Sequence, residues 1–413
     1  MKKNKDILIV GFALFSIFFG AGNLIFPPFI GMVSGSNWLT SFSGFVIADV
    51  GIILLSIYAV SKAGSFQNVV GKAGKKFGIS LEVIMMLCLG PILVIPRTAA
   101  TTFEISILPF FPNWSPVIMM AIYFLINLFF VLRRSSIIDT IGKFLTPALI
   151  IILIIIIVKG VINPIGDIAS TGATNVISYS LLEGYQTMDA LAGLLFSSVI
   201  TSSIVSKGYK GKEINSVLLN SSFIAIIGLA FVYGGLTFIG AHTVNLVDSN
   251  ISNTALLVFI SKKILGTSGI LLIGIAIGLA CLTTSIGLLT TGSTFFEKVT
   301  NGKLSYKFNA IAISLMSYII ACQGVDKIVK LSVPILNVLY PVAITLIAVT
   351  MFNKFLTNVI AVRFAVYASL IFGVLFQLFG SSLNFMPLAN IGFGWVLPTV
   401  IALGIGYFIK ENK

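Results

Sequence analysis

The sequence predicts an all-α polytopic membrane protein. Three observations indicate this: 57% of its 413 residues are hydrophobic, only 9% are charged, and the mean hydropathy is +1.07. Soluble domains carry roughly 25% charged residues, and a helix needs about 20 apolar residues to cross a bilayer. We therefore expect the lipid bilayer to surround most of this chain.

Apolar runs of that length predict about twelve transmembrane helices within one domain covering residues 1–413. The first run is too long for the core of a signal peptide, so we expect it to remain in the mature protein. The expected helices lie near 7–30, 38–61, 79–110, 115–132, 137–159, 181–206, 214–241, 269–294, 304–322, 328–351, 359–379 and 391–410.

The positive charge is concentrated on alternate connections between these helices. With the N-terminus in the cytoplasm, most of the 26 Lys and Arg residues lie on inner loops such as 62–78, 207–212 and 298–307. This asymmetry follows the positive-inside rule for an even number of spans and predicts that both termini are cytoplasmic. The net charge of +13 therefore implies no nucleic-acid partner.

The first helix carries a signal for an interruption. Gly20-Ala21-Gly22-Asn23 and Pro27-Pro28 lie inside the run 7–30, where glycine loosens a helix and proline removes a backbone donor. Broken helices survive in lipid only where they are buried in protein or line a wet cavity. The half-helix that begins near Gly22 would direct free N–H groups at an anion such as a carboxylate. The alternative is a glycine packing face or a proline kink without a site.

A second interruption is expected five helices later. The stretch Glu183–Gly193 places two acids, an amide and two glycines in a membrane-length segment. An odd number of spans separates the two interruptions, which indicates inverted repeats at 7–159 and 181–351 whose broken helices meet near the midplane. Residues 359–410 add two further helices. Asp189 either serves this site or caps the half-helix that follows it.

Charged residues inside the expected spans are further candidates. Asp49 is either a functional carboxylate or a hydrogen-bonded structural one. Arg97 and Glu104 are seven residues apart, so they share a helix face and predict a structural ion pair, with a substrate contact as the alternative. Lys143 either pairs with Asp139, four residues before it, or supplies a positive charge inside the bundle.

Three consecutive hydroxyl residues, Thr283-Thr284-Ser285, lie in the middle of the span 269–294. Single Ser and Thr residues usually bond a carbonyl of their own helix. Three together can offer oxygen ligands to a hard cation.

Several classes of protein lack support in this sequence. No G-x-x-x-x-G-K-[ST] phosphate loop occurs, and no loop is large enough for a nucleotide-binding domain, so no ATPase subunit is implied. The single His permits no His-based triad, and the three Cys residues form no metal-binding pattern. We therefore expect neither an enzyme nor a resident cofactor. A channel would be expected to carry a repeated filter or a charged ring, and neither is present.

Four motifs resemble the bacterial branched-chain amino acid:cation symporter family, in order and over nearly the whole chain. They are Gly20-Ala21-Gly22-Asn23-Leu24-Ile25-Phe26-Pro27-Pro28, Gly90-Pro91 with Ile95-Pro96-Arg97-Thr98-Ala99, Gly142-Lys143-Phe144-Leu145-Thr146-Pro147, and Glu183-Gly184-Tyr185 with Thr187-Met188-Asp189-Ala190-Leu191-Ala192-Gly193. The family belongs to the amino acid–polyamine–organocation group. The resemblance implies the leucine-transporter fold, a five-plus-five inverted repeat in which helices one and six are broken, in a bacterial plasma membrane.

The same resemblance implies a set of binding residues. Backbone N–H groups of Ala21, Gly22 and Asn23 would take the substrate carboxylate. Carbonyls near Gln186, Thr187 and Asp189 would take its ammonium group, and the apolar side chain would lie against Val94 and Leu288.

For a coupling Na⁺, the resemblance implies the carbonyl of Ala280 and the hydroxyls of Thr283 and Thr284, completed by the carbonyls of Ser16 and Phe19. In proton-coupled relatives of this fold a lysine of helix five takes the place of that sodium, and Lys143 is similar in position.

These expectations combine into one function. We expect a symporter that imports leucine, isoleucine or valine on a Na⁺ or H⁺ gradient by alternating access. The alternatives are an amino-acid sensor on the same scaffold and a passive channel.

Overall fold

The computed structural model describes residues 2–133 and 137–409, with the side chains of 2, 137–146, 198, 199, 202 and 381 outside that description. Every regular element within these ranges is a helix. Seven helices are long and apolar enough to cross a membrane, and three shorter apolar helices accompany them. The expected all-α membrane protein is thus confirmed, while the number of twelve spans remains a prediction.

Helix one is broken where the sequence predicts. Its halves are α1 (Lys2–Phe18) and α2 (Ala21–Ser34), and Gly20 between them has an extended backbone with φ −116° and ψ −170°. The turn of helix that would join the halves is missing, so the first N–H groups of α2 lie next to the break.

Helix six is broken as well. Its halves are α10 (Val176–Tyr185) and α11 (Asp189–Ser206). Met188, directly before α11, has φ +64°, a left-handed conformation that interrupts an α-helix. The three residues 186–188 therefore form an unwound turn, and their carbonyls are available to partners outside the helix.

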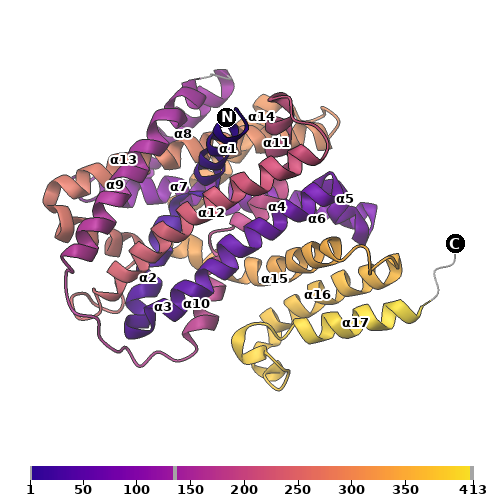
Figure 1. The fold of residues 1–413 in the computed structure, drawn as a ribbon. Coiled ribbons are helices and arrows are strands. Elements are labelled where there is room, and N and C mark those ends of the chain that lie inside the picture. Colours follow the sequence, from indigo (N-terminus) through magenta and orange to yellow (C-terminus); the bar gives the residue numbers. More distant parts are fainter. Residues whose placement is uncertain (1, 134–136, 410–413) are drawn as a thin grey trace.

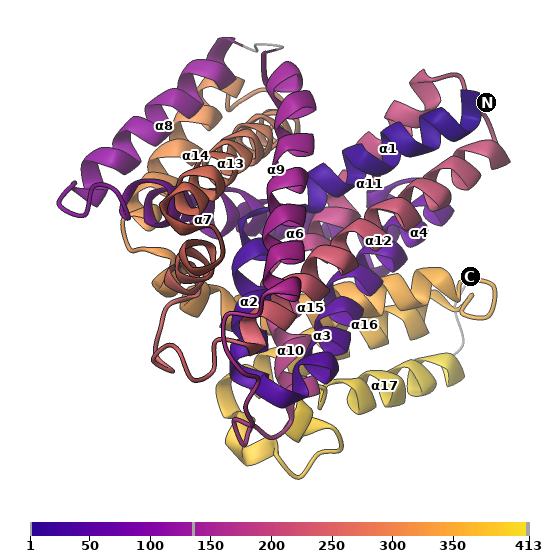
Figure 2. The same cartoon turned by 60° about the vertical axis from the view of Figure 1, so that its left-hand side comes forward.

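Four spans form one bundle around these breaks. The second span consists of α3 (Trp38–Val46), a π-helical turn η2 (Ile47–Gly51) and α4 (Ile52–Ala63). It packs along α10 and α11, while α1 and α2 pack along α12 (Lys212–Ala241) (Figures 1 and 2). The two interrupted spans are therefore held in the same bundle.

The remaining helices form a scaffold beside this bundle. The third span is bent at a π-helical turn, η4 (Cys88–Ile92), where Gly90 has non-helical angles (φ −90°, ψ −112°), as the prolines of this span predict. The central part of the scaffold is α13 (Asn253–Val299), which packs against α7, α9 and α14 (Figure 2). The other elements of the scaffold are α6 (Lys75–Leu87), α7 (Val94–Thr102), η5 (Phe103–Ile107), α8 (Pro116–Arg133), α9 (Ile137–Ile162), α14 (Tyr306–Ala321) and α15 (Val325–Met351).

The last two helices lie at the edge of the molecule. α16 (Val359–Phe379) packs on α15, and α17 (Val396–Phe408) packs on α16 (Figure 1, yellow). Neither has an extensive contact with the two broken spans, so the site is built by the helices before them.

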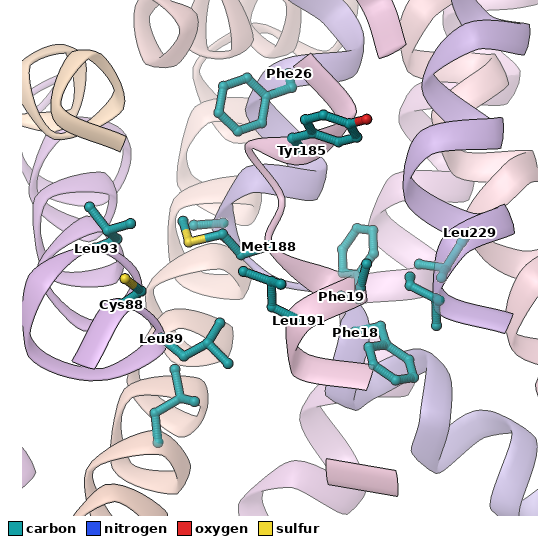
Figure 3. Packing of buried hydrophobic residues seen from close by; sticks show 14 of the residues in the cluster. Phe18, Phe19, Phe26, Cys88, Leu89, Leu93, Tyr185, Met188, Leu191 and Leu229 are labelled. Carbon is teal, nitrogen blue, oxygen red and sulfur yellow. The ribbon is translucent and has the colours of Figure 1, made fainter. Parts of the chain in front are cut away.

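The apolar core reaches both breaks. Phe18 and Phe19 at the end of α1 are 1% and 3% exposed, and Met188 in the unwound turn is fully buried. Figure 3 shows these side chains in one cluster with Leu89 and Leu191. Tight apolar packing on both sides fixes the unwound segments in place.

Candidate functional site

Asn23 joins the two breaks directly. Its Oδ1 atom accepts a hydrogen bond from the backbone N–H of Gly20 at 3.0 Å. Its Nδ2 atom donates to Oδ2 of Asp189 at 2.6 Å and to the hydroxyl of Tyr233 on α12. Asn23 is 1% exposed, so this amide connects three spans away from solvent.

Asp49 approaches the same point from the second span. It lies in the π-helical turn η2 and is fully buried. Oγ1 of Thr187, in the unwound turn, lies 2.8 Å from Oδ1 of Asp49 and 2.8 Å from the carbonyl oxygen of Gly184, so its single hydroxyl proton is shared between these two acceptors. The carboxylate therefore fixes the side chain of an unwound residue.

Arg97 of α7 supplies the positive charge of the site. Its guanidinium donates to the carbonyl of Gln186 at 2.5 Å and to that of Thr187 at 3.4 Å, and it lies 5.6 Å from the ring centre of Phe26. The side chain is 3% exposed and interacts electrostatically with Asp189. The carbonyls expected to bind a substrate ammonium thus hold a guanidinium in this conformation.

The expected ion pair between Arg97 and Glu104 is wrong. Glu104 accepts hydrogen bonds from the hydroxyl of Thr254 at 2.5 Å and from the backbone N–H of Val325 at 2.9 Å. The two residues share a helix face, but seven residues of helix set them about 10 Å apart along its axis, and Arg97 instead donates to the carbonyls of Gln186 and Thr187.

The remaining candidates lie at the two breaks: Gln186 in the unwound turn, and Ala21 and Gly22 at the start of α2. Gln186 accepts a hydrogen bond at Oε1 from the hydroxyl of Ser332 on α15. Ala21 and Gly22 are buried in the first turn of α2, and a Cβ atom added to Gly22 would lie 3.0 Å from Nη2 of Arg97. The N-terminus of α2 therefore adjoins the guanidinium, and the structure brings Asn23, Gln186, Thr187 and Asp189 together.

The two apolar candidates lie on helices that pack together. Val94 begins α7, and Leu288 is 8% exposed on α13. α7 packs against both α13 and α2. A contact between these two side chains and a substrate remains a prediction.

The predicted ligands of the cation come from two parts of the fold, α13 and the first break. The hydroxyl of Thr283 donates to the carbonyl of Ala280 at 2.9 Å, so these two oxygens are neighbours on α13. This bond is also the usual one for a hydroxyl within its own helix. Thr284 is half-buried beside it, whereas Ser16 and Phe19 lie at the end of α1. Convergence of all five oxygens on one ion remains a prediction.

The side chain of Lys143 lies outside the described residues, although its backbone lies within α9. Its role as a coupling group therefore remains a prediction.

The sequence did not single out Tyr233 and Ser332 as site residues, and it left the roles of Asp49 and Arg97 open. Tyr233 and Ser332 lie in apolar spans without an adjacent motif, and a single hydroxyl there gives a weak signal. Asp49 and Arg97 were recognised as candidates because they are charged residues inside expected membrane spans. Their partners, however, depend on the unwound turn and the π-helical turns, which side-chain spacing does not encode.

Comparisons with known proteins agree with this architecture. A profile of the family described as "Branched-chain amino acid transport protein" matches residues 3–413. The branched-chain amino acid permease BraB of Bacillus subtilis (strain 168) is 35% identical over 437 residues, covering 99% of this chain and 97% of that protein.

Solved structures share the fold at low sequence identity. The inward-facing conformation of Mhp1 has a TM-score of 0.64 at 12% identity and covers 96% of this chain and 90% of its own. MhsT, solved in complex with L-phenylalanine, has a TM-score of 0.56 at 15% identity, with coverages of 96% and 97%. Together with the two broken spans, these likenesses show the leucine-transporter fold. The family match and BraB add the class of the protein, a membrane transport protein and not an enzyme.

The family follows from the sequence match. Because the profile covers nearly the whole chain and BraB exceeds one third identity over almost its full length, the chain belongs to the family of branched-chain amino acid transport proteins.

Proposed function

We propose that this protein is a symporter that imports leucine, isoleucine or valine together with Na⁺ or H⁺ across a bacterial plasma membrane, with both termini in the cytoplasm. The observation that carries the proposal is the hydrogen bond from Asn23 to Asp189, because it brings two interrupted spans together beside a buried guanidinium. Broken spans that meet in this way are typical of substrate sites in secondary transporters.

The two ends of a zwitterion match the two breaks. The substrate carboxylate is placed at the N-terminus of α2, where N–H groups of Ala21, Gly22 and Asn23 and the helix dipole favour an anion. The ammonium group is placed at the carbonyls of Gln186 and Thr187, which accept hydrogen bonds from a cationic donor in this conformation. The ammonium displaces the guanidinium of Arg97, which then turns to the carboxylate beside Gly22.

The substrate side chain and the coupling ion complete the proposal. Val94 and Leu288 form the apolar wall against the aliphatic side chain. A Na⁺ ion is held by Ser16, Phe19, Ala280, Thr283 and Thr284, and Lys143 is the candidate positive charge if a proton takes its place. In either case, ion and amino acid must strengthen each other's binding by the same factor.

The central test is leucine uptake into proteoliposomes with sodium and pH gradients imposed separately. We expect concentrative uptake with at least one of the two gradients, since a symporter draws its driving force from the coupled ion. Leucine binding without uptake would instead identify a sensor. Uptake without counterflow would identify a channel, because counterflow requires a carrier.

Two substitutions test the residue assignments in the same assay. Asn23→Ala removes the bond to Asp189, and Thr284→Ala removes a proposed ion ligand, so we expect each to abolish or strongly reduce ion-driven uptake. Thr294→Ala is the matched control, because this exposed hydroxyl of α13 bonds only the carbonyl of Thr290 at 2.9 Å. Wild-type uptake with unchanged ion dependence in both site variants would contradict the assignments.

A further inference from the structure

Two carboxyl groups meet inside the bundle. Asp49 is 0% exposed and Asp189 is 7% exposed. Thr187 links them, because its hydroxyl oxygen lies 2.8 Å from Oδ1 of Asp49 and accepts a hydrogen bond from the backbone N–H of Asp189 at 3.4 Å, and the two acids interact electrostatically. They come from different spans, the π-helical turn η2 and the start of α11. Two ionised carboxylates held this near each other repel strongly away from water, so one of them is expected to hold a proton.

The surrounding groups supply only part of the compensating charge. The amide of Asn23 and the hydroxyl of Thr187 each donate to one carboxylate oxygen. Arg97 is the cation that faces the pair, from α7, and it acts on Asp189. Among the described side chains, Oδ2 of Asp49 is buried without a hydrogen-bond partner.

The other titratable groups around the pair are neutral. Tyr233 of α12 faces both acids, as does Tyr340 of α15, which stacks on Tyr185 of α10 at 3.9 Å. The thiol of Cys281 on α13 interacts electrostatically with Arg97. One guanidinium and two carboxylates therefore leave one uncompensated negative charge, which is costly at membrane depth.

We propose that Asp49 and Asp189 hold one proton between them and form a proton-binding site separate from the cation site on α1 and α13. A proton suits this pair better than a metal ion, because among the described residues no third acid, histidine or cysteine joins the two carboxyl groups as a further ligand. The buried oxygen of Asp49 that lacks a hydrogen-bond partner can carry the proton, and its binding makes the cluster with Arg97 neutral.

Substrate binding is linked to this proton through Arg97, a step that rests on the proposed function. Nη2 of Arg97 adjoins Gly22, so a substrate carboxylate at the start of α2 attracts the guanidinium. The substrate ammonium takes the place of the guanidinium at the carbonyls of Gln186 and Thr187. Because it binds these carbonyls, it compensates Asp189 less than the guanidinium does, and the pair retains its proton more strongly. By linkage, leucine binds more tightly as the pH falls, by up to about tenfold per pH unit for one proton.

Infrared difference spectroscopy tests the proton site without any substrate. Purified wild-type protein is expected to show the C=O stretching band of a buried protonated carboxyl group, which disappears on titration to alkaline pH. Asp49→Asn is expected to remove the band, because Asp189 then remains ionised beside Arg97. Glu104→Gln is the matched control, since this buried acid bonds Thr254 and Val325 far from the pair, and it should keep the band.

The substrate-linked arm measures leucine affinity, and proton uptake on leucine binding in weak buffer, over the pH range in which the infrared band of wild type titrates. Wild type and Glu104→Gln are expected to take up as much as one proton per leucine, whereas Asp49→Asn binds leucine with little dependence on pH. Should Asp49→Asn not fold, Asp189→Asn serves in its place.

The infrared experiment and the leucine-binding experiment can contradict the two parts of the proposal independently. Absence of a protonated carboxyl band in wild type, or its persistence in both aspartate variants, would overturn the proton site. Wild-type protein that binds no branched-chain amino acid would overturn the proposed function and leave the infrared test valid. Leucine binding without proton uptake would overturn the linkage through Arg97.

Discussion

At the scale of single residues, the site depends on one buried cation that binds backbone carbonyls. The unwound turn exposes the carbonyls of Gln186 and Thr187 because residues 186–188 leave the helical path, and Arg97 satisfies both. A guanidinium can reach two acceptors at once because its donors form a rigid planar fork. The same side chain also compensates Asp189, so it joins the local backbone conformation to the charge balance of the site.

Replacing this cation should destabilise the protein. Arg97→Met leaves Asp189 uncompensated and two carbonyls unbonded, and removal of one partner from a buried charge pair costs about 3–5 kcal/mol. Thermal unfolding in detergent should therefore show a clear fall in Tm, together with loss of leucine binding. Arg97→Lys should recover part of the stability, because it keeps the charge but loses the fork.

Arg133→Met is the control for this series. Arg133 is exposed and lies 4.1 Å from the ring centre of Phe129, so its loss should change the Tm little. A Tm for Arg97→Met equal to that of wild type would show that the guanidinium does not hold the unwound turn.

Residue types in the site could be predicted from the sequence better than their partners. Asn23, Asp49 and Asp189 are conspicuous because polar groups are expensive in a membrane span. The pairing of Arg97 could not be predicted, since its partners, the carbonyls of Gln186 and Thr187, become available only because residues 186–188 leave the helix.

At the scale of elements, close backbone contacts hold the bundle together. A Cβ atom added to Gly240 on α12 would lie 2.0 Å from the carbonyl oxygen of Pro28 on α2, and one added to Gly31 would lie 2.0 Å from that of Thr237. The two helices therefore approach each other through glycines on both sides, as small residues allow in membrane helices. This contact positions α2, and with it Asn23.

A single methyl group at this contact should separate the helices. In Gly240→Ala the obstacle is backbone and cannot rotate away, so we expect a destabilisation of about 1–3 kcal/mol, the usual cost of overpacking. Leucine uptake should fall with it, because α2 carries the proposed site for the substrate carboxylate. The measurements are the Tm in detergent and uptake into proteoliposomes.

Gly404→Ala provides the comparison. This exposed glycine of α17 has no atom within 4 Å of an added Cβ, so alanine there should be neutral or slightly stabilising through its helix propensity. Equal stability of the two variants would contradict the close approach of α2 and α12.

The interruptions themselves were predictable because unusual residues mark them in runs that are otherwise long enough to span a membrane: glycine, asparagine and proline in the first, and acids, an amide and glycines in the second. The lengths of the continuous helices were less predictable. α13 begins at Asn253, before the expected span at 269–294, and a turn at Gly266 with φ +66° divides it. A lone glycine in an apolar run does not reveal whether it bends a helix or only packs.

At the scale of the whole molecule, alternating access requires the bundle to move against the scaffold. Lys62, at the end of α4, crosses this boundary and donates to the carbonyl of Met351 at the end of α15. Lys72 donates to Oδ1 of Asn353 at 2.9 Å in the same region. Both lysines supply positive charge at the C-terminus of α15, where the helix dipole favours cations. A cavity of about 220 Å³ lies between these residues and is bordered by Thr350.

Loss of the Lys62 contact should favour the conformation in which this end of the molecule is open. Thr350 is 1% exposed, so a Thr350→Cys reporter, in a chain whose native cysteines are replaced, should react slowly with a membrane-impermeant maleimide. Adding Lys62→Met should increase the labelling rate about two- to fivefold, since an exposed charged contact shifts such an equilibrium modestly. Lys75→Met, at an exposed lysine of α6, should leave the rate unchanged. Equal labelling rates of Thr350→Cys with and without Lys62→Met would mean that the boundary between bundle and scaffold does not open at Lys62. The boundary between the helices that move and those that stay fixed would then lie elsewhere in the molecule.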